Sequence, residues 1–225
     1  MSERLSDRPV QPGEPAPNFV LDAITRDGKI ALADFRGSPV LVGLFRGLQC
    51  PFCRRHIAAM AQLDGALREK GVDSLTVVNT PIERARLYFR YHPLPNLLAA
   101  SDPQRDSHRA FGLPTVEFTE NETAWPHKVS LAVARSTPVD VPDELPEPMD
   151  SFAAAEFLNQ KDRYEITEDD ERMIAANGSG QLVGQFLIDR EGIVRWTFTE
   201  YAGEGRNMLG APTPNEVMSA AAQVV

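Results

Sequence analysis

Two cysteines separated by two residues are the part of this sequence best suited to chemistry. They lie in the segment Cys50-Pro51-Phe52-Cys53 and are the only cysteines among the 225 residues. Two thiols at this spacing can close into a disulfide and open again, so the pair can carry two electrons. Closing so short a loop removes little entropy from the unfolded chain, so a purely stabilising crosslink is the weaker interpretation.

Burial as small apolar residues and a zinc site are the competing interpretations of the pair. A closed zinc site needs four ligands, but the sequence has no second cysteine pair and only four histidines, of which His56 lies nearest. We expect His56, three residues after Cys53, to point to a neighbouring helix face and solvent. The residues favour redox chemistry, and we predict no metal and no cofactor because no nucleotide or flavin motif is found.

The residues on both sides of the pair predict a buried strand that leads into a helix. Val40 to Phe45 is apolar on both faces, which is typical of a central strand covered on both sides. After Cys53, apolar residues recur near helical spacing as far as Lys70-Gly71, which supply a cationic last turn and a stop signal. The two cysteines are therefore expected at the N-terminus of a helix.

This position favours a reactive thiol. Unpaired backbone N–H groups and the positive end of a helix stabilise a thiolate, and Arg46 or Arg54 could add positive charge beside the thiolate or the substrate. The first cysteine in such a geometry is usually the exposed one. We therefore predict Cys50 as the nucleophile and Cys53 as the resolving thiol, and we interpret Phe52 as a packing residue that could also cover the disulfide.

The rest of the chain predicts an α/β protein. Strands and helices alternate as far as Gly112, which favours a mostly parallel sheet covered by helices. Turn signals predict a hairpin near each end of the chain, and Thr213-Pro214 begins a last helix. The expected elements are strands at 19–24, 29–32, 40–45, 72–79, 97–100, 185–188 and 193–198, and helices from 53 to 70, from Thr80-Pro81 to 91, and from Asp102-Pro103 to 112.

The alternation stops between Thr115 and Gly180, so we interpret this segment as an insertion. It holds five prolines, an acidic run at 140–144 and two predicted helices, at 151–160 and from Thr167, capped with Asp170, to before Gly178. The insertion could be a lid or a dimer contact, or neither. Trp125 within it is either an anchor for the segment or part of a binding surface.

Charge and hydropathy restrict the partners. The formal net charge is −9 and the basic residues form no stripe, which disfavours binding to nucleic acid or to an anionic membrane. No stretch approaches the length of a membrane-spanning helix, and residues 1–17 are polar and proline-rich. We expect a cytoplasmic protein with a disordered N-terminus over residues 1–12.

Four segments carry a resemblance to a known family: the strand before the cysteines, Gly13 to Leu21, Ala100 to Pro103 and Phe186 to Gly192. Together they resemble the peroxiredoxin branch, alkyl hydroperoxide reductase and thiol-specific antioxidant, of the thioredoxin-fold superfamily. The match covers about residues 10–114 and 181–225. It implies a thioredoxin-like domain over 13–225, with a central mixed sheet flanked by helices, an N-terminal β-hairpin extension and a helical insertion at about 115–180.

The resemblance also shows where this chain departs from peroxiredoxins. Cys50 falls on the peroxidatic position, but the usual threonine or serine, proline and arginine are replaced by Gly47, Gly43 and Val183. The Cys-Pro-Phe-Cys motif itself resembles glutaredoxins and thioredoxin-like reductases. Those proteins carry a cis-proline facing the cysteines where Val183 falls here; Pro114 is the other candidate for that role.

These observations lead to three functional hypotheses. We expect thiol–disulfide exchange through Cys50 and Cys53, with Gly47, Pro51, Phe52 and Val183 facing the site. A thiol-dependent hydroperoxide peroxidase, in which Cys50 becomes a sulfenic acid resolved by Cys53, is the alternative enzyme. A non-enzymatic redox sensor, or a relic that tolerates loss of both thiols, is the alternative of another class. The expected partners are a thiol reductant and a disulfide or hydroperoxide, and the chain could form a homodimer.

Overall fold

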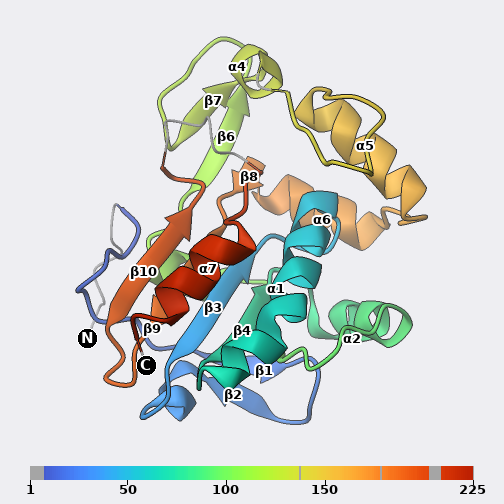
Figure 1. Ribbon diagram of the computed structural model, residues 1–225. Coiled ribbons are helices and arrows are strands. Elements are labelled where there is room, and N and C mark those ends of the chain that lie inside the picture. Colours follow the sequence, from blue (N-terminus) through green and yellow to red (C-terminus); the bar gives the residue numbers. More distant parts are fainter. Residues whose placement is uncertain (1–7, 137, 178, 203–208, 225) are drawn as a thin grey trace.

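A seven-stranded sheet forms the centre of the protein in a computed structural model, which describes residues 8–136, 138–177, 179–202 and 209–224. Figure 1 shows this sheet with helices packed against it. The strand order is β10-β9-β3-β4-β5-β1-β2. The strands are β1 (Val20–Ala23), β2 (Lys29–Ala31), β3 (Val40–Phe45), β4 (Asp73–Val78), β5 (Ala99–Ser101), β9 (Gly184–Ile188) and β10 (Val194–Thr199).

The sheet is mixed, as the resemblance implied. Only the β3–β4 and β4–β5 pairs are parallel, while β1–β2, β1–β5, β3–β9 and β9–β10 are antiparallel. The expectation of a mostly parallel sheet was therefore wrong. A crossover helix makes two strands parallel only where it connects them. The strands of the two hairpins, β1–β2 and β9–β10, are joined by turns and are therefore antiparallel.

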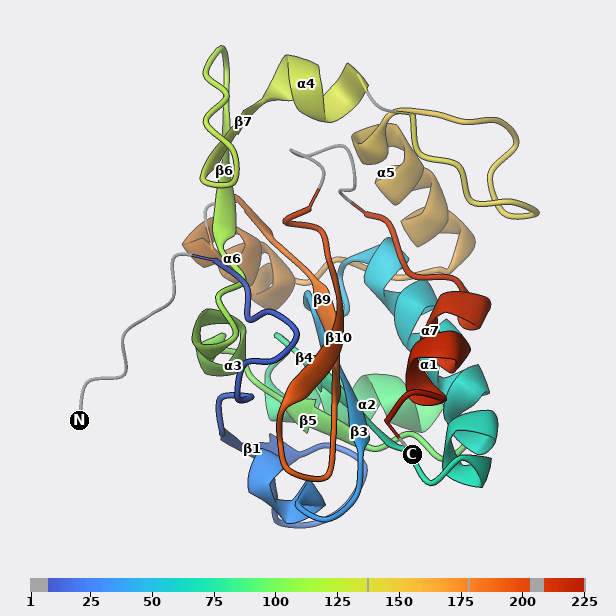
Figure 2. The same cartoon turned by 60° about the vertical axis from the view of Figure 1, so that its left-hand side comes forward.

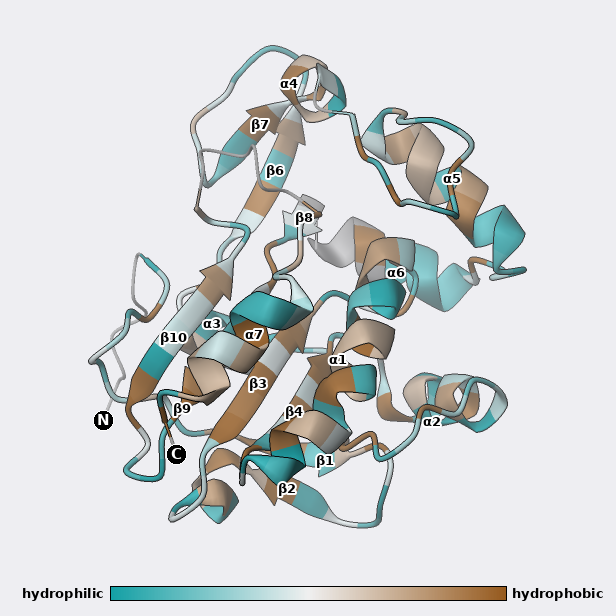
Figure 3. Cartoon of the chain, viewed as in Figure 1, coloured by the Kyte–Doolittle hydropathy of each residue, from teal (hydrophilic) through white to brown (hydrophobic). Residues whose placement is uncertain are grey.

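Strand β3 separates two apolar cores because its side chains alternate between the faces of the sheet. Leu41 and Phe45 pack with residues of α1 (Pro51–Glu69), α2 (Ile82–Tyr91) and α7 (Pro214–Ala221). Val42 and Leu44 face the other core, which lies beside α3 (Asp106–Ala110). Figure 2 shows α1 and α7 on one side of the sheet and α3 on the other, and Figure 3 shows β3 and β4 as a hydrophobic centre.

Three predicted helix starts have different outcomes. The Thr213 capping box at α7 is confirmed, with reciprocal hydrogen bonds between Thr213 and Glu216. Helix α2 begins at Ile82 without a side-chain cap, because the hydroxyl of Thr80 accepts a hydrogen bond from the Leu48 N–H instead, at 2.8 Å. Helix α3 begins at Asp106, later than expected, because Asp102 caps it from four residues upstream.

The N-terminal segment packs against the domain around Val10, whereas the sequence predicted disorder over residues 1–12. Val10 is buried and its N–H donates to the Phe111 carbonyl at 3.1 Å. Gly112 permits this contact, since a Cβ atom there would lie 2.0 Å from the Arg8 carbonyl oxygen. Residues 1–7 lie outside the described part of the chain.

The segment between Thr115 and Gln181 contains a small sheet besides its helices. Strands β6 (Thr115–Thr119), β7 (Lys128–Ser130) and β8 (Ser179–Gln181) form it in the order β7-β6-β8. Both predicted helices are present as α5 (Ser151–Lys161) and α6 (Glu168–Asn177), and a short α4 (Leu131–Ser136) precedes them. Trp125 anchors the segment by donating its indole N–H to the Tyr201 carbonyl at 2.9 Å. A 3-10 turn, η1 (Leu32–Phe35), follows β2.

Candidate active site

The two cysteines lie where β3 ends and α1 begins, as the sequence predicted. Cys50 is the N-cap of α1 and Pro51 is its first residue, where the missing N–H costs no helical hydrogen bond. The Cys50 sulfur accepts a hydrogen bond from the Cys53 N–H at 3.4 Å. Cys50 is partly exposed, whereas Cys53 is fully buried.

A short turn of residues 46–49 holds Cys50 in place from the strand side. The Cys50 N–H donates to the Gly47 carbonyl at 3.0 Å. The Leu48 N–H is fixed by Thr80, and the Leu48 carbonyl accepts from Arg54 Nη1 at 2.7 Å. The N–H and the carbonyl of Leu48 are therefore both paired, which helps to hold the turn that presents Cys50.

The environment separates the acidities of the two thiols. Hydrogen bonding from the Cys53 thiol, together with the charge of Arg46 and the Cys53 N–H, outweighs burial and lowers the pKa of Cys50 to about 6. Burial, followed by the interaction with Cys50, raises the pKa of Cys53 well above its usual value. Near neutral pH, Cys50 is then mostly a thiolate and Cys53 a thiol.

The acidity of Cys50 gives a direct test. Alkylation by iodoacetamide should be half-maximal near pH 6, because only the thiolate reacts and the pKa of Cys50 is lowered to about 6. The rate should rise with pH through that value and then level off. Mass spectrometry of the alkylated peptide would assign the modified residue. A midpoint near the ordinary thiol pKa of about 8.5 would contradict this assignment.

A buried ion pair lies beside Cys53. Arg46 Nη1 approaches the Cys53 sulfur at 3.7 Å, and the same guanidinium binds Glu200 through two hydrogen bonds of 3.1 and 2.5 Å. Glu200 is fully buried and also accepts the N–H groups of Val183 and Leu209, each at 2.8 Å. Arg46 is thus brought into the site as expected, but next to the buried thiol.

Glu200 was not among the candidates from the sequence. Its only local signal is an acidic side chain directly after a strand of the second hairpin. Its partner Arg46 lies 154 positions away. The pairing of two such distant residues is set by β9 lying beside β3, which the local pattern does not reveal.

Arg54 does not take the role expected of it, because the insertion engages its guanidinium. It binds Asp162 at 2.6 Å and Asn159 at 2.8 Å in addition to the Leu48 carbonyl. Its hydrogen bond to Leu48 ties Arg54 to the turn that precedes Cys50. His56 was also expected to face solvent, but its Nδ1 is buried, and burial followed by the charge of Arg46 lowers its pKa to about 4.

The sequence matches the model of a known protein family over the segment that forms this site. The model described as the AhpC/TSA family matches residues 12–137. The chain belongs to the AhpC/TSA family. The match extends from the N-terminal segment through the Cys50–Cys53 pair into the insertion, so it includes the strand, turn and helix that form the site. A comparison with curated protein sequences finds no match.

Solved structures share the fold of this AhpC/TSA-family chain at low identity. Peroxidoxin BcpB from Mycobacterium tuberculosis is 10% identical with a TM-score of 0.55, covering 96% of this chain and 99% of its own. A peroxiredoxin-like protein from Aquifex aeolicus is 12% identical with a TM-score of 0.58, covering 96% and 89%. A secreted thiol-disulfide isomerase from Corynebacterium glutamicum is 13% identical with a TM-score of 0.51, covering 93% and 84%.

The structure explains how this member of the AhpC/TSA family accommodates its unusual residues. A Cβ atom at Gly43 would lie 2.4 Å from the Phe45 ring, and one at Gly47 would lie 2.0 Å from Gln49 Oε1. The space of a side chain at position 47 is thus taken by the Gln49 carboxamide. Its Oε1 is buried and has no hydrogen-bond partner in the described part of the chain.

The resemblance aligns Val183 with the cis-proline of thioredoxin-like reductases. Val183 is buried in the same apolar cluster as Cys53. The Leu113–Pro114 bond is trans, and the Pro114 carbonyl accepts the Leu182 N–H at 3.1 Å, so Pro114 pairs with the residue before Val183. Phe52 is buried as a packing residue, against the insertion.

The described residues form neither a metal site nor a membrane-spanning helix. No group of three or more histidine, cysteine, aspartate or glutamate side chains there is arranged to hold a metal ion. Within the same residues, every helix is too short or too polar to span a bilayer.

Proposed function

We propose that this AhpC/TSA-family protein is a thiol–disulfide oxidoreductase in which Cys50 attacks the substrate and Cys53 resolves the intermediate. The observation that carries the proposal is the difference between the two thiols. A partly exposed thiol of lowered pKa caps the helix, and a buried thiol of raised pKa lies behind it. This asymmetry supports a first attack by Cys50 and a second by Cys53.

The reaction proceeds in two exchanges. The Cys50 thiolate attacks one sulfur of the substrate disulfide, forming a mixed disulfide and releasing the other sulfur as a thiolate. The Cys53 thiol gives up its proton, which the released thiolate takes up, and then attacks the Cys50 sulfur. The second substrate sulfur leaves as a thiolate, the protein holds a Cys50–Cys53 disulfide, and two electrons have passed to the substrate.

Arg46 supports the second exchange. Cys53 is buried and must become anionic before it can attack, which burial opposes. The guanidinium at 3.7 Å offers positive charge to the forming thiolate. Glu200 fixes the guanidinium through two hydrogen bonds, so Arg46 contacts the reacting sulfur and Glu200 acts as a positioning residue.

A hydroperoxide peroxidase is the second candidate, and family membership favours it. The Cys50 thiolate would attack the outer peroxide oxygen and release the other oxygen as hydroxide or alkoxide, which takes up a proton. Cys53 would then attack the sulfenic acid, releasing water and leaving the same disulfide. Against it, Gly43, Gly47 and Val183 replace the residues that usually activate the peroxide.

Stopped-flow fluorescence of the reduced protein distinguishes the two reactions. We expect 2-hydroxyethyl disulfide to oxidise the protein faster than hydrogen peroxide or tert-butyl hydroperoxide does, with each rate depending on Cys50. Rates with the hydroperoxides close to that of a free thiol would support disulfide exchange. Hydroperoxide rates far above a free thiol would instead assign a peroxidase.

The proposed reaction requires a reductant and a reducing compartment. Each turnover leaves an oxidised pair, so a protein dithiol or two small thiols must return two electrons. We place the protein in the cytoplasm, where such thiols are abundant and a dithiol stays reduced. A homodimer is part of the proposal, and sedimentation of the reduced and oxidised protein would test it.

A further inference from the structure

The insertion packs against the first turn of the catalytic helix. Phe52 of α1 forms an apolar cluster with Leu145, Ala154 and Leu158, three residues of the insertion. Cys50 packs against this cluster and keeps part of its surface exposed. Figures 1 and 2 both show α5 above the N-terminal end of α1. One side of the reactive thiol is therefore occupied by the insertion.

An ionic cluster joins the same two parts of the chain. Arg55 binds Asp162 through two hydrogen bonds of 2.9 Å and binds Glu144 through two more, one of them at 2.9 Å. Arg54 binds Asp162 at 2.6 Å. We call these four residues the latch. Its two arginines follow Cys53 directly, and its two carboxylates flank the helix α5 that packs on Phe52.

The two arginines of the latch are largely buried, unlike the members of a surface ion pair. The side chain of Arg54 is 5% exposed and that of Arg55 is 18% exposed. The guanidinium of Arg54 also lies 4.4 Å from the centre of the Tyr164 ring. Partly buried arginines with carboxylate partners hold their geometry better than exposed pairs do.

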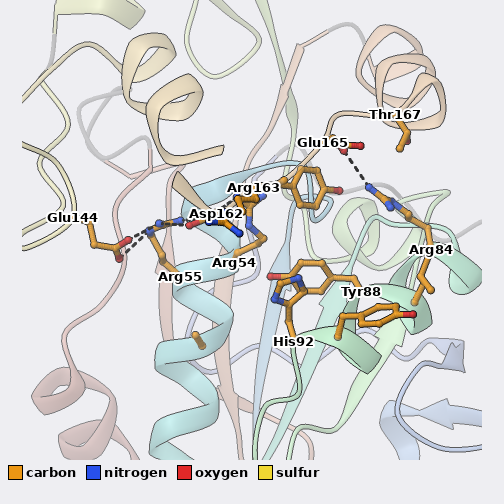
Figure 4. Close-up of a pocket in the computed structure, with 14 residues that line it drawn as sticks. Arg54, Arg55, Arg84, Tyr88, His92, Glu144, Asp162, Arg163, Glu165 and Thr167 are labelled. Atoms are coloured by element: carbon orange, nitrogen blue, oxygen red, sulfur yellow. Dashed lines mark hydrogen bonds and ion pairs between the residues drawn. The ribbon is translucent and has the colours of Figure 1, made fainter. Parts of the chain in front are cut away.

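The four latch residues also line a cleft of about 530 Å³. Its walls are formed by α1, α2 and the segment after α5, and Figure 4 shows Tyr88 and His92 facing the latch residues across it. The cysteines are not among its lining residues. The latch residues thus form one wall of a cleft that the cysteines do not line.

We propose that the latch holds the insertion over Cys50 and thereby restricts the enzyme to small disulfides, excluding disulfides of folded proteins. This inference rests on the proposed function. Exchange requires the attacking, central and leaving sulfurs to lie nearly in line. A small disulfide can reach this geometry from the exposed side of Cys50, whereas a protein disulfide brings two flanking backbones that collide with the insertion.

The test compares two substrates, 2-hydroxyethyl disulfide and insulin, in matched variants. Asp162→Asn removes the carboxylate shared by both arginines, and Glu144→Gln removes the more exposed partner. We expect the ratio of kcat/KM for insulin to kcat/KM for 2-hydroxyethyl disulfide to rise roughly tenfold in Asp162→Asn and less in Glu144→Gln. Amide exchange at 145–162 should accelerate in the same order.

Asp169→Asn is the control, because it makes the same charge change in an exposed pair with Arg172 elsewhere in the insertion. Its ratio and its amide exchange should match those of the unmodified protein. An unchanged ratio in both latch variants, with faster exchange at 145–162, would overturn the latch. Absence of Cys50-dependent turnover of 2-hydroxyethyl disulfide in every protein would instead overturn the proposed function.

Discussion

Replacing Cys50 with serine is expected to abolish turnover, lowering kcat/KM for 2-hydroxyethyl disulfide by about 10³-fold or more. The lost group is the only partly exposed thiol, and its pKa is lowered to about 6. A serine hydroxyl at the same N-cap keeps the helix capped but is not ionised near neutral pH. The fold should therefore persist while the chemistry stops.

Cys53→Ser is the informative partner of this variant. Serine keeps an O–H that can donate to the Cys50 sulfur, so Cys50 should remain acidic and the first attack should proceed. The second exchange cannot occur, so the mixed disulfide should accumulate at one equivalent per chain, visible by intact-mass spectrometry. Absence of the adduct in Cys53→Ser, or undiminished turnover of Cys50→Ser, would contradict the proposed roles.

The elements around the dithiol could be predicted because their signals are local. Strand β3 has six consecutive buried residues, and helix α1 has apolar residues at helical spacing. Each signal lies within the element that it predicts. The position of the cysteines follows from the junction between them. Thr80 shows the limit of such reasoning, since its favourable capping pattern was overridden by a tertiary hydrogen bond to Leu48.

The residues that complete the site could not be predicted because their partners are distant in sequence. Asp162 meets Arg54 across 108 positions. The sheet of the insertion was missed for the same reason, since β6 pairs with β8 at the far end of the insertion. In addition, β7 and β8 have only three residues each. Short strands give no periodicity to read, and their pairing is decided by the fold.

Glu200→Gln is expected to destabilise the protein by about 3–5 kcal/mol, because it leaves the charge of buried Arg46 without its partner. Each carboxylate oxygen accepts two donors, one from Arg46 and one backbone N–H, from Leu209 at Oε1 and from Val183 at Oε2. A carboxamide can offer only one acceptor oxygen. Its NH2 group would then face two N–H donors in either orientation.

The same substitution should make both thiols more acidic. The charge of Glu200 raises the pKa of Cys50 and of Cys53, and Arg46 opposes it at both. Removing the carboxylate leaves Arg46 uncompensated at 3.7 Å from the Cys53 sulfur, so the pKa of Cys53 should fall most. Urea unfolding measures the stability, and ultraviolet thiolate absorbance against pH measures the two titrations.

Glu122→Gln is the matched control, since it removes a carboxylate from an exposed pair with Lys128. It should change neither the unfolding midpoint nor the thiol titrations appreciably. A stable Glu200→Gln protein with unchanged thiols would show that the buried pair is a packing feature without influence on the dithiol. A fall in the Cys53 pKa in Glu200→Gln alone would establish that a residue remote in sequence sets the acidity of the resolving thiol, and with it the rate of the second exchange.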